Sequence, residues 1–371
     1  MKGVYSMPDW SKSMEQSFEY YTVEPSTLAD VKRLYDVKTA SFNRDSGVES
    51  LGSATIDVVN SVGESYIRCY LKTIQEGVTE KFPLGTVLSQ TPSSTFNGKV
   101  MDVSMDCYTP LIELKEKQPP LGYTVRKGTR IMDAAYNIVS KNCRVPVNKV
   151  EPIFGEDQNG EEIDLSPTLQ YDFVANTNDT YLSFVIALIA NANYELGLGD
   201  RGDILFQPKQ KLESLQPVWK YNDDNSSILY SEITVNHDLY GIPNVVEVIY
   251  SYGADYKEAI AINDDPNSPT STISRGRQII HRVTDPSLRG YVTQEQLDKY
   301  AEQLLEELST LEYTVSYQHA YCPVRLGDCV RLNYTRAGII DIKAKVISQT
   351  IKAEPGCPVS EKAVFTSKLW R

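Results

Sequence analysis

The clearest pattern of apolar and polar positions lies between residues 293 and 334, where the spacing changes from helical to extended. Thr293 and Gln296 fit a capping box, in which side chains and backbone amides at a helix start bond reciprocally. One apolar stripe follows at three- and four-residue spacing: Leu297, Tyr300, Ala301, Leu304, Leu305, Leu308 and Leu311. The period then becomes two, with one strand face made of Tyr313, Val315, Tyr317, His319 and Tyr321. The pattern predicts a helix over 293–311, a strand, a turn at 323–328 and a second strand at 329–334.

The first third of the chain has the pattern of β-structure. Between 66 and 73, apolar positions alternate with a second set, which predicts a half-buried strand with one wet face made of Tyr66, Arg68, Tyr70 and Lys72. Asn97-Gly98 is a strong hairpin signal before a strand at 101–107. The Leu84-Gly85 and Leu326-Gly327 turns, each expected to open a strand, hint at two related β-regions.

The middle section mixes both patterns. Helical spacing predicts a helix over 129–142, and Asn178 or Asp179 caps a second, buried helix that extends to about Leu196. A second β-region begins near 212 and includes strands at 228–236, 245–252 and 339–351. We therefore expect a mainly β protein with α/β inserts (α+β). The expected division is a first β-domain at 1–117, an α/β insert at 118–210, and a second β-domain at 211–371 that contains the helix 293–311.

Composition narrows the class of protein. The 371 residues are 41% hydrophobic and 23% charged, as in ordinary globular proteins, and include 24 tyrosines. The net charge of −12 argues against stable nucleic-acid binding, which needs clustered Lys and Arg. Residues 1–18 lack a continuous apolar stretch, and the apolar run 184–190 is too short to span a bilayer. Neither a signal peptide nor a membrane anchor is therefore expected. The six cysteines form no C-x-x-C pair, so reduced thiols in a cytoplasm are expected.

Two motifs suggest chemistry, but each has a plainer structural interpretation. Residues 197–202 match G-x-G-x-x-G, yet the loop is expected to follow a helix and precede a strand, the reverse of a dinucleotide site. A helix end and turn are favoured. His319 and Cys322 have the residue types of an imidazole–thiol pair, but three residues along a strand place side chains on opposite faces. The other histidines, His237 and His281, are scattered, so no metal cluster is predicted.

The charged clusters are also interpreted as structure. A calcium loop is a poor fit to the acidic residues Glu156, Asp157, Glu161, Glu162 and Asp164, and solvated turns are favoured there and at 222–225. Arg275-Gly276-Arg277 is too short for a nucleic-acid patch. Among the 49 acidic residues, no facing pair stands out as a glycosidase would require. No catalytic, cofactor-binding or metal-binding residue is therefore assigned.

The order of motifs in the last third resembles the C-terminal part of baseplate hub proteins. These proteins occur in contractile phage tails and in phage-tail-like bacteriocins and prophages of Gram-positive bacteria. The resemblance is carried by Gly276-Arg277, His281, Asp285-Pro286-Ser287, the capped helix, Tyr317-x-His319 and the run from Cys322 to Leu332. Lys127-Gly128-Thr129, the helix 178–196 with 203–206, and the segment 242–245 fit the same layout.

The resemblance implies two tail-tube-like β-barrels with smaller inserted domains. It also implies a homotrimer, whose six barrels form a pseudo-sixfold ring that joins the hexameric tail tube to the trimeric spike. Other baseplate subunits are further implied partners, and no cofactor is implied. Such a protein is non-enzymatic, and an acidic lumen is consistent with the net charge of −12. We expect it in the bacterial cytoplasm during assembly and then in the baseplate of the released virion or tail-like particle.

Two alternative functions stay open on the sequence. One is a carbohydrate-active or cell-wall hydrolase of the tail tip that uses carboxylates. The other is a host-surface binding module that uses exposed aromatic residues such as Trp10, Trp219 or Trp370.

Overall fold

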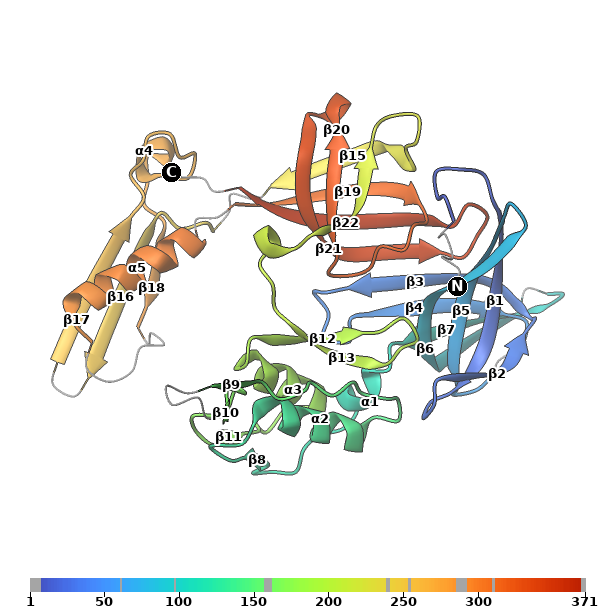
Figure 1. The fold of residues 1–371 in the computed structure, drawn as a ribbon, viewed down its shortest axis with the longest axis horizontal. Helices are drawn as coiled ribbons and strands as arrows, with labels where there is room; N and C mark the ends of the chain where they lie inside the picture. The colour runs from blue at the N-terminus through green and yellow to red at the C-terminus, as the bar shows by residue number, and fades with distance from the viewer. Residues whose placement is uncertain are drawn as a thin grey trace. The chain divides into compact units, whose positions relative to one another are not determined.

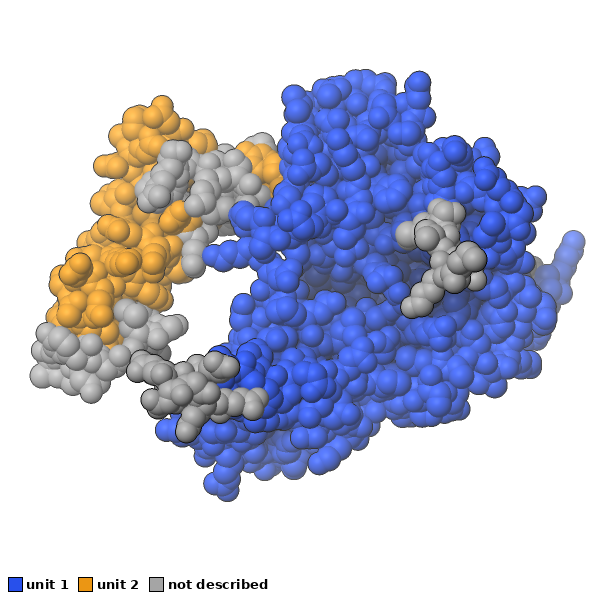
Figure 2. Space-filling model, in the orientation of Figure 1, with its two compact units in different colours: residues 1–232, 317–362 blue, residues 233–316, 363–371 orange. Residues whose placement is uncertain are grey.

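The protein is described from a computed structural model that covers residues 8–60, 62–96, 98–156, 162–237, 241–252, 255–284, 292–308 and 311–367. The chain forms two compact units (Figure 2). Unit 1 comprises Met1–Glu232 and Tyr317–Lys362, and unit 2 comprises Ile233–Ser316 and Ala363–Arg371. The division into domains at 1–117, 118–210 and 211–371 stays a prediction.

The largest sheet has 13 strands, and the protein is mainly β as expected. The strands of this sheet are β1 Glu15–Glu24, β2 Ala29–Leu34, β3 Val37–Asp45, β4 Gly52–Val58, β5 Tyr66–Gln75, β6 Val78–Phe96, β7 Met101–Tyr108, β14 Pro217–Asn222, β15 Leu229–His237, β19 Leu311–Ala320, β20 Cys329–Tyr334, β21 Ile339–Lys352 and β22 Pro358–Ser367. The main path of pairing is β15-β19-β22-β21-β3-β4-β7-β6-β5-β1-β2, and among the described residues it does not close into a barrel.

The sheet contains two series of strands with the same order (Figure 1). The order in the N-terminal series is β3-β4-β7-β6-β5-β1, and in the C-terminal series it is β15-β19-β22-β21-β20-β14. Taken position by position, the corresponding strands are β3 and β15, β4 and β19, β7 and β22, β6 and β21, β5 and β20, and β1 and β14. These strands also follow each other in the same order along the chain. The outermost pair differs, because β1 runs antiparallel to β5 whereas β14 runs parallel to β20. The chain therefore contains a structural repeat.

The residues that hinted at this repeat do not correspond to each other. Leu84-Gly85 lies inside β6, and Leu326-Gly327 precedes β20. In the repeat, however, the counterpart of β6 is β21. The repeat is thus visible in strand order, and the match proposed from the two Leu-Gly turns is wrong.

The middle segment of unit 1 packs short helices and hairpins on a shared apolar core. Its helices are α1 Ile112–Lys115, α2 Ile131–Asn142, α3 Tyr181–Ala190 and the 3-10 turn η1 Leu212–Ser214. Its strands form the pairs β8 Thr124–Val125 with β11 Phe173–Val174, β9 Phe154–Glu156 with β10 Glu162–Asp164, and β12 Tyr194–Leu198 with β13 Ile204–Pro208. The cap of α3 is Thr180, which forms a capping box with Ser183, rather than Asn178 or Asp179. Leu196 belongs to β12, so the helix ends earlier than predicted.

Unit 2 contains a three-stranded sheet covered by one helix. The elements are β16 Val245–Tyr252, β17 Asp255–Ile262, α4 Thr272–Arg275, β18 Ile280–Val283 and α5 Gln294–Leu308. Leu297, Ala301 and Leu305 of the predicted apolar stripe pack on Val246 and Val248 of β16. The predicted capping box is confirmed, because Thr293 N–H donates to Gln296 Oε1 (2.9 Å) and Gln296 N–H donates to Thr293 Oγ1 (3.3 Å).

Candidate functional site at the joint between the two strand series

The two strand series meet edge to edge in unit 1. Strand β3 pairs antiparallel with the end of β21, so that Ser41–Asp45 lies opposite Ser348–Lys352. Beyond the ladder, Ser46 N–H donates to the Ile347 carbonyl at 2.9 Å. Figure 1 shows β3 and β21 side by side although they come from opposite ends of the chain. Backbone hydrogen bonds alone therefore make one continuous sheet of the two series.

Side chains strengthen this joint. Arg44 of β3 donates from Nη1 to Gln349 Oε1 of β21 at 3.0 Å. The Trp10 ring lies edge-on against Phe82 of β6 and Tyr321 after β19, with centroid distances of 5.0 and 5.2 Å. Trp10 is only 6% exposed, so of the two roles open to it on the sequence, surface binding and core packing, the structure supports core packing. Its ring packs residues of both series together.

Behind the joint lies a buried polar network centred on Glu361 of β22. The Glu361 carboxylate accepts hydrogen bonds from Gln349 (2.5 Å), Tyr221 (3.4 Å) and Tyr317. The His319 Nε2 atom lies 3.5 Å from the same carboxylate. These residues come from β21, β14, β19 and β22, so one carboxylate connects four strands of the C-terminal series. Burying these polar side chains costs little free energy here, because each of them has a hydrogen-bond partner or a polar neighbour.

His319 and Cys322 are neighbours, contrary to the prediction. The Cys322 sulfur lies 3.9 Å from His319 Nδ1, and the Tyr221 hydroxyl lies 3.3 Å from the sulfur and 3.2 Å from His319 Nε2. They meet because β19 ends at Ala320, so the alternation of a strand no longer governs Cys322. His319 is 0% exposed and Cys322 is 1% exposed, so a substrate would reach neither without opening the core. The arrangement is suited to holding strands together rather than to nucleophilic catalysis.

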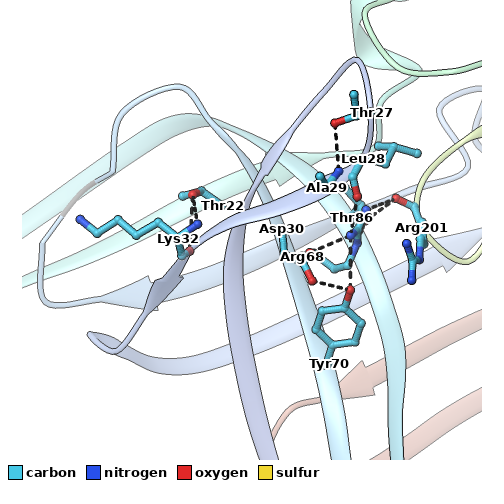
Figure 3. Close-up of polar contacts among 10 residues, drawn as sticks. All are labelled: Thr22, Thr27, Leu28, Ala29, Asp30, Lys32, Arg68, Tyr70, Thr86 and Arg201. Atoms are coloured by element: carbon cyan, nitrogen blue, oxygen red, sulfur yellow. Dashed lines mark hydrogen bonds and ion pairs between the residues drawn. The ribbon is translucent and has the colours of Figure 1, made fainter.

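A second buried cluster surrounds Arg68 of β5 (Figure 3). The Arg68 guanidinium donates to Thr86 Oγ1 (2.9 Å) and to the Asp30 carboxylate (2.8 Å). It also donates to the carbonyls of Leu28 (2.9 Å) and Arg201 (2.7 Å). Arg68 is 0% exposed, and the first six residues of β5 are buried on both faces. The predicted wet face of this strand is therefore wrong.

The segment that covers Arg68 is the G-x-G-x-x-G loop. Gly197 and Leu198 belong to β12, and Gly199–Gly202 lie in the turn of the β12–β13 hairpin. The predicted turn is confirmed and the predicted helix end is wrong, because a strand precedes the turn; the loop does not open a helix. At Gly202, φ is +95°, and an added Cβ would lie 2.8 Å from the Thr86 Cβ. On its other flank, Asp200 pairs with Arg325 at 2.6 Å. The loop thus touches the N-terminal series through Thr86 and Arg68 and the C-terminal series through Arg325, a role that the sequence interpretation missed.

The other candidate motifs make structural contacts. Asp223 accepts a hydrogen bond from Thr335 N–H (2.9 Å), and Asp164 pairs with Arg130 (2.6 Å). Gly276 ends α4 with φ 61°. Outside the described residues lie Asn97, Asp157, Glu161, Asp285-Pro286-Ser287 and Trp370. Within the described ranges, no group of three or more His, Cys, Asp or Glu side chains is placed to hold a metal ion, and no helix has the length and apolarity to cross a membrane.

Comparison with known proteins identifies the fold. Neither the family models nor the curated proteins contain a match to this sequence. Among solved structures, a tail protein from Neisseria meningitidis MC58 has a TM-score of 0.64 at 10% identity, covering 96% of this chain and 98% of that one. The 43 kDa tail protein of prophage MuSo2 from Shewanella oneidensis has a TM-score of 0.61 at 10% identity, covering 95% and 98%. The prophage tail protein gp18 from Listeria monocytogenes EGD-e has a TM-score of 0.52 at 12% identity, covering 95% of both chains.

These similarities extend over nearly the whole of each chain. The protein therefore has the fold of prophage tail proteins, as its resemblance to baseplate hub proteins predicted. Because the identities are so low, the comparisons establish the fold and leave the activity to be argued from the site.

Replacing Arg68 with Ala should destabilise the protein by about 3 kcal/mol or more, because it removes the donor to the Leu28 carbonyl and the charge that pairs with Asp30. The Arg201 carbonyl and Asp30 would keep only their second donors, Thr86 and Tyr70. Urea unfolding of both proteins measures the difference. The control is Arg331→Ala, which removes a surface ion pair with Asp341 and should cost at most about 1 kcal/mol. Equal losses in the two variants would contradict the account of the buried cluster.

Replacing Gly202 with Ala should destabilise the protein by about 1–3 kcal/mol, because the new Cβ meets Thr86 and the backbone has positive φ. Gly128→Ala is the matched control, since Gly128 has φ +81° with nothing within 4 Å of the added Cβ. The control therefore carries only the backbone cost, about 1 kcal/mol. Thermal melts of the two variants check the order, and a Gly128 variant as unstable as the Gly202 variant would contradict the docking of the loop.

Stability should fall as the pH rises above 6.5 because of His319. Burial opposes a charge on His319, but its contacts with Cys322 and Glu361 outweigh burial and raise its pKa to about 10. Because the pKa of His319 is higher in the folded protein than in the unfolded chain, protonation of His319 stabilises the fold. This stabilisation is fully present below the unfolded pKa of 6.5 and is lost as the pH rises from 6.5 to about 10. Its upper limit is about 5 kcal/mol. Urea titrations across this range should show the loss in the natural protein, and His319→Gln should lack it. An unchanged pH profile in that variant would refute the assignment.

Proposed function

We propose that the protein is a structural baseplate hub of a contractile tail or tail-like injection particle. Three copies form a pseudo-hexameric ring that joins the hexameric tail tube to the trimeric spike. The fold shared with tail proteins supports a structural role in the tail. Each strand series then corresponds to one tube-like barrel, completed by contacts with neighbouring copies.

The observation that carries the proposal is the repeated strand order within one chain. Two series with the same order are joined edge to edge through β3 and β21. A chain that contains two similar strand series contributes six of them to a ring when three copies assemble. Such a ring fits a hexameric partner on one side and a threefold partner on the other, which is the task of an adapter between tube and spike.

The distribution of polar groups supports a non-enzymatic role. The side chains that gather into networks, around Glu361 and Arg68, are enclosed between strands and bonded to one another. The net charge of −12 suits a lumen that repels nucleic acid and keeps it from adhering during passage. Wall-degrading activity would then belong to another subunit of the particle. The protein would assemble in the bacterial cytoplasm and leave the cell in the baseplate.

The proposal predicts that the chain forms a trimer alone or when its tube and spike proteins are added. Light scattering and native mass spectrometry should find a species of three times 41.7 kDa, or that species bound to its partners. A chain that stays at 41.7 kDa with both partners present would contradict the hub function. Hydrolysis of cell-wall glycan that is lost on one Asp or Glu substitution would instead support the tail-tip hydrolase.

A further inference from the structure

Two edges in the sheet lack the partner that the structural repeat predicts for them. On β21, the edge opposite β22 is occupied by β3 over Ser348–Lys352. Strand β6 is the counterpart of β21, and β7 is the counterpart of β22. On β6, the edge opposite β7 is occupied by β5 only as far as Leu88, which pairs with both strands. Beyond it, within the described residues, the segment Gln90–Phe96 has no strand on that edge.

The strand that would fill this place is the counterpart of β3, which is β15. In the described sheet β15 ends the path, with β19 on one edge and no strand on the other. It has high β-propensity in Ile233, Thr234 and Val235, and most of its side chains are exposed. An uncovered strand of this kind is a template for pairing with another chain. The vacant segment of β6 is likewise exposed from Thr91 to Phe96 and contains no charged residue.

We propose that Ile233–His237 of β15 in one copy pairs antiparallel with Pro92–Phe96 of β6 in the next copy, reproducing between chains the β3–β21 pairing that exists within the chain. The occupant is a second copy, because within the described residues no strand pairs with either edge, and each edge belongs to the counterpart of a strand already paired in the joint. The contact joins two different surfaces, so it continues from copy to copy and closes when the rotation permits. This inference rests on the proposed hub function and names the strands that form its ring.

The repeat also predicts the register. Strands β3 and β15 both have nine residues, and β21 and β6 both end at a hairpin that leads to the next strand. Within the chain, Ile351 lies opposite Phe42. Ile351 is the last residue but one of β21, as Thr95 is of β6, and Phe42 is the sixth residue of β3, as Thr234 is of β15. The repeat therefore places Thr95 of one copy opposite Thr234 of the next. Pro92 has no N–H to donate, which is tolerated in a strand that is an edge until the next copy arrives.

Disulfide trapping in the full-length protein tests this pairing. The double variant Thr95→Cys with Thr234→Cys should form covalent oligomers up to a closed trimer under mild oxidation. The oxidation is carried out both on the protein alone and with tube and spike proteins added, and the trimer is expected in at least one of the two conditions. The natural cysteines are all buried and form no disulfide. The matched control combines Thr95→Cys with Tyr230→Cys, four residues or about 13 Å along the same strand, too far for a disulfide. It and each single variant should give no covalent trimer.

Charge variants give an independent second test, since Thr95 and Thr234 are both exposed in the single chain. Thr95→Asp with Thr234→Asp should lower the trimer fraction at least tenfold, and Thr95→Asp with Thr234→Lys should restore it. If the natural protein is a trimer but neither the disulfide nor the charge pattern appears, the pairing is wrong and the hub function stands. If the protein stays a monomer with its partners present, the hub function itself fails.

Discussion

The backbone pairing of β3 with β21 is the contact on which the rest of the structure depends. It joins strands separated by almost the whole chain, with Ser41–Asp45 opposite Ser348–Lys352. Without it, no backbone pairing between strands would join the two series in the described residues. The polar side chains of the joint then act as positional constraints. Arg44 bonds to Gln349, Gln349 bonds to Glu361, and Glu361 fixes Tyr317 and His319, so an error in register at one strand would leave buried groups unpaired.

The middle segment is attached by the same kind of interaction. The β12–β13 turn offers a backbone carbonyl, that of Arg201, to two donors of the N-terminal series, Arg68 and Thr86. It offers a carboxylate, that of Asp200, to Arg325 of the C-terminal series. A buried guanidinium that lost these acceptors would be strongly destabilising. The loop is therefore held in place by the need to satisfy Arg68, and the glycine at 202 lets the backbone come close enough to do so.

Local pattern predicted much of the fold and little of the site. The helix from Thr293, its capping box, the strand after it and the turn at 323–328 follow from short-range spacing, and the structure confirms them. The predicted helix end at Leu311 is wrong, because α5 ends at Leu308 and Leu311 belongs to β19. Arg68 was placed on a wet face because its neighbours alternate, yet it is covered by Arg201, which is 133 residues away. His319 and Cys322 were assigned to opposite faces because the strand was assumed to continue. The first error concerns a partner that only tertiary packing supplies, because alternation carries no information about a covering segment. The second concerns the end of β19 at Ala320, which the alternation does not mark. The two Leu-Gly turns hinted at a repeat but matched the wrong strands, since strand order is a property of pairing rather than of residue identity.

Electron cryo-microscopy of the assembled tail tip, viewed along the particle axis, tests the central claim most directly. The account predicts a ring at the end of the tube with six similar β-rich lobes contributed by three chains, in which lobes within a chain and between chains are joined by the same strand pairing. A ring of three lobes, a ring of six separate chains, or a position of this protein outside the tube axis would contradict it.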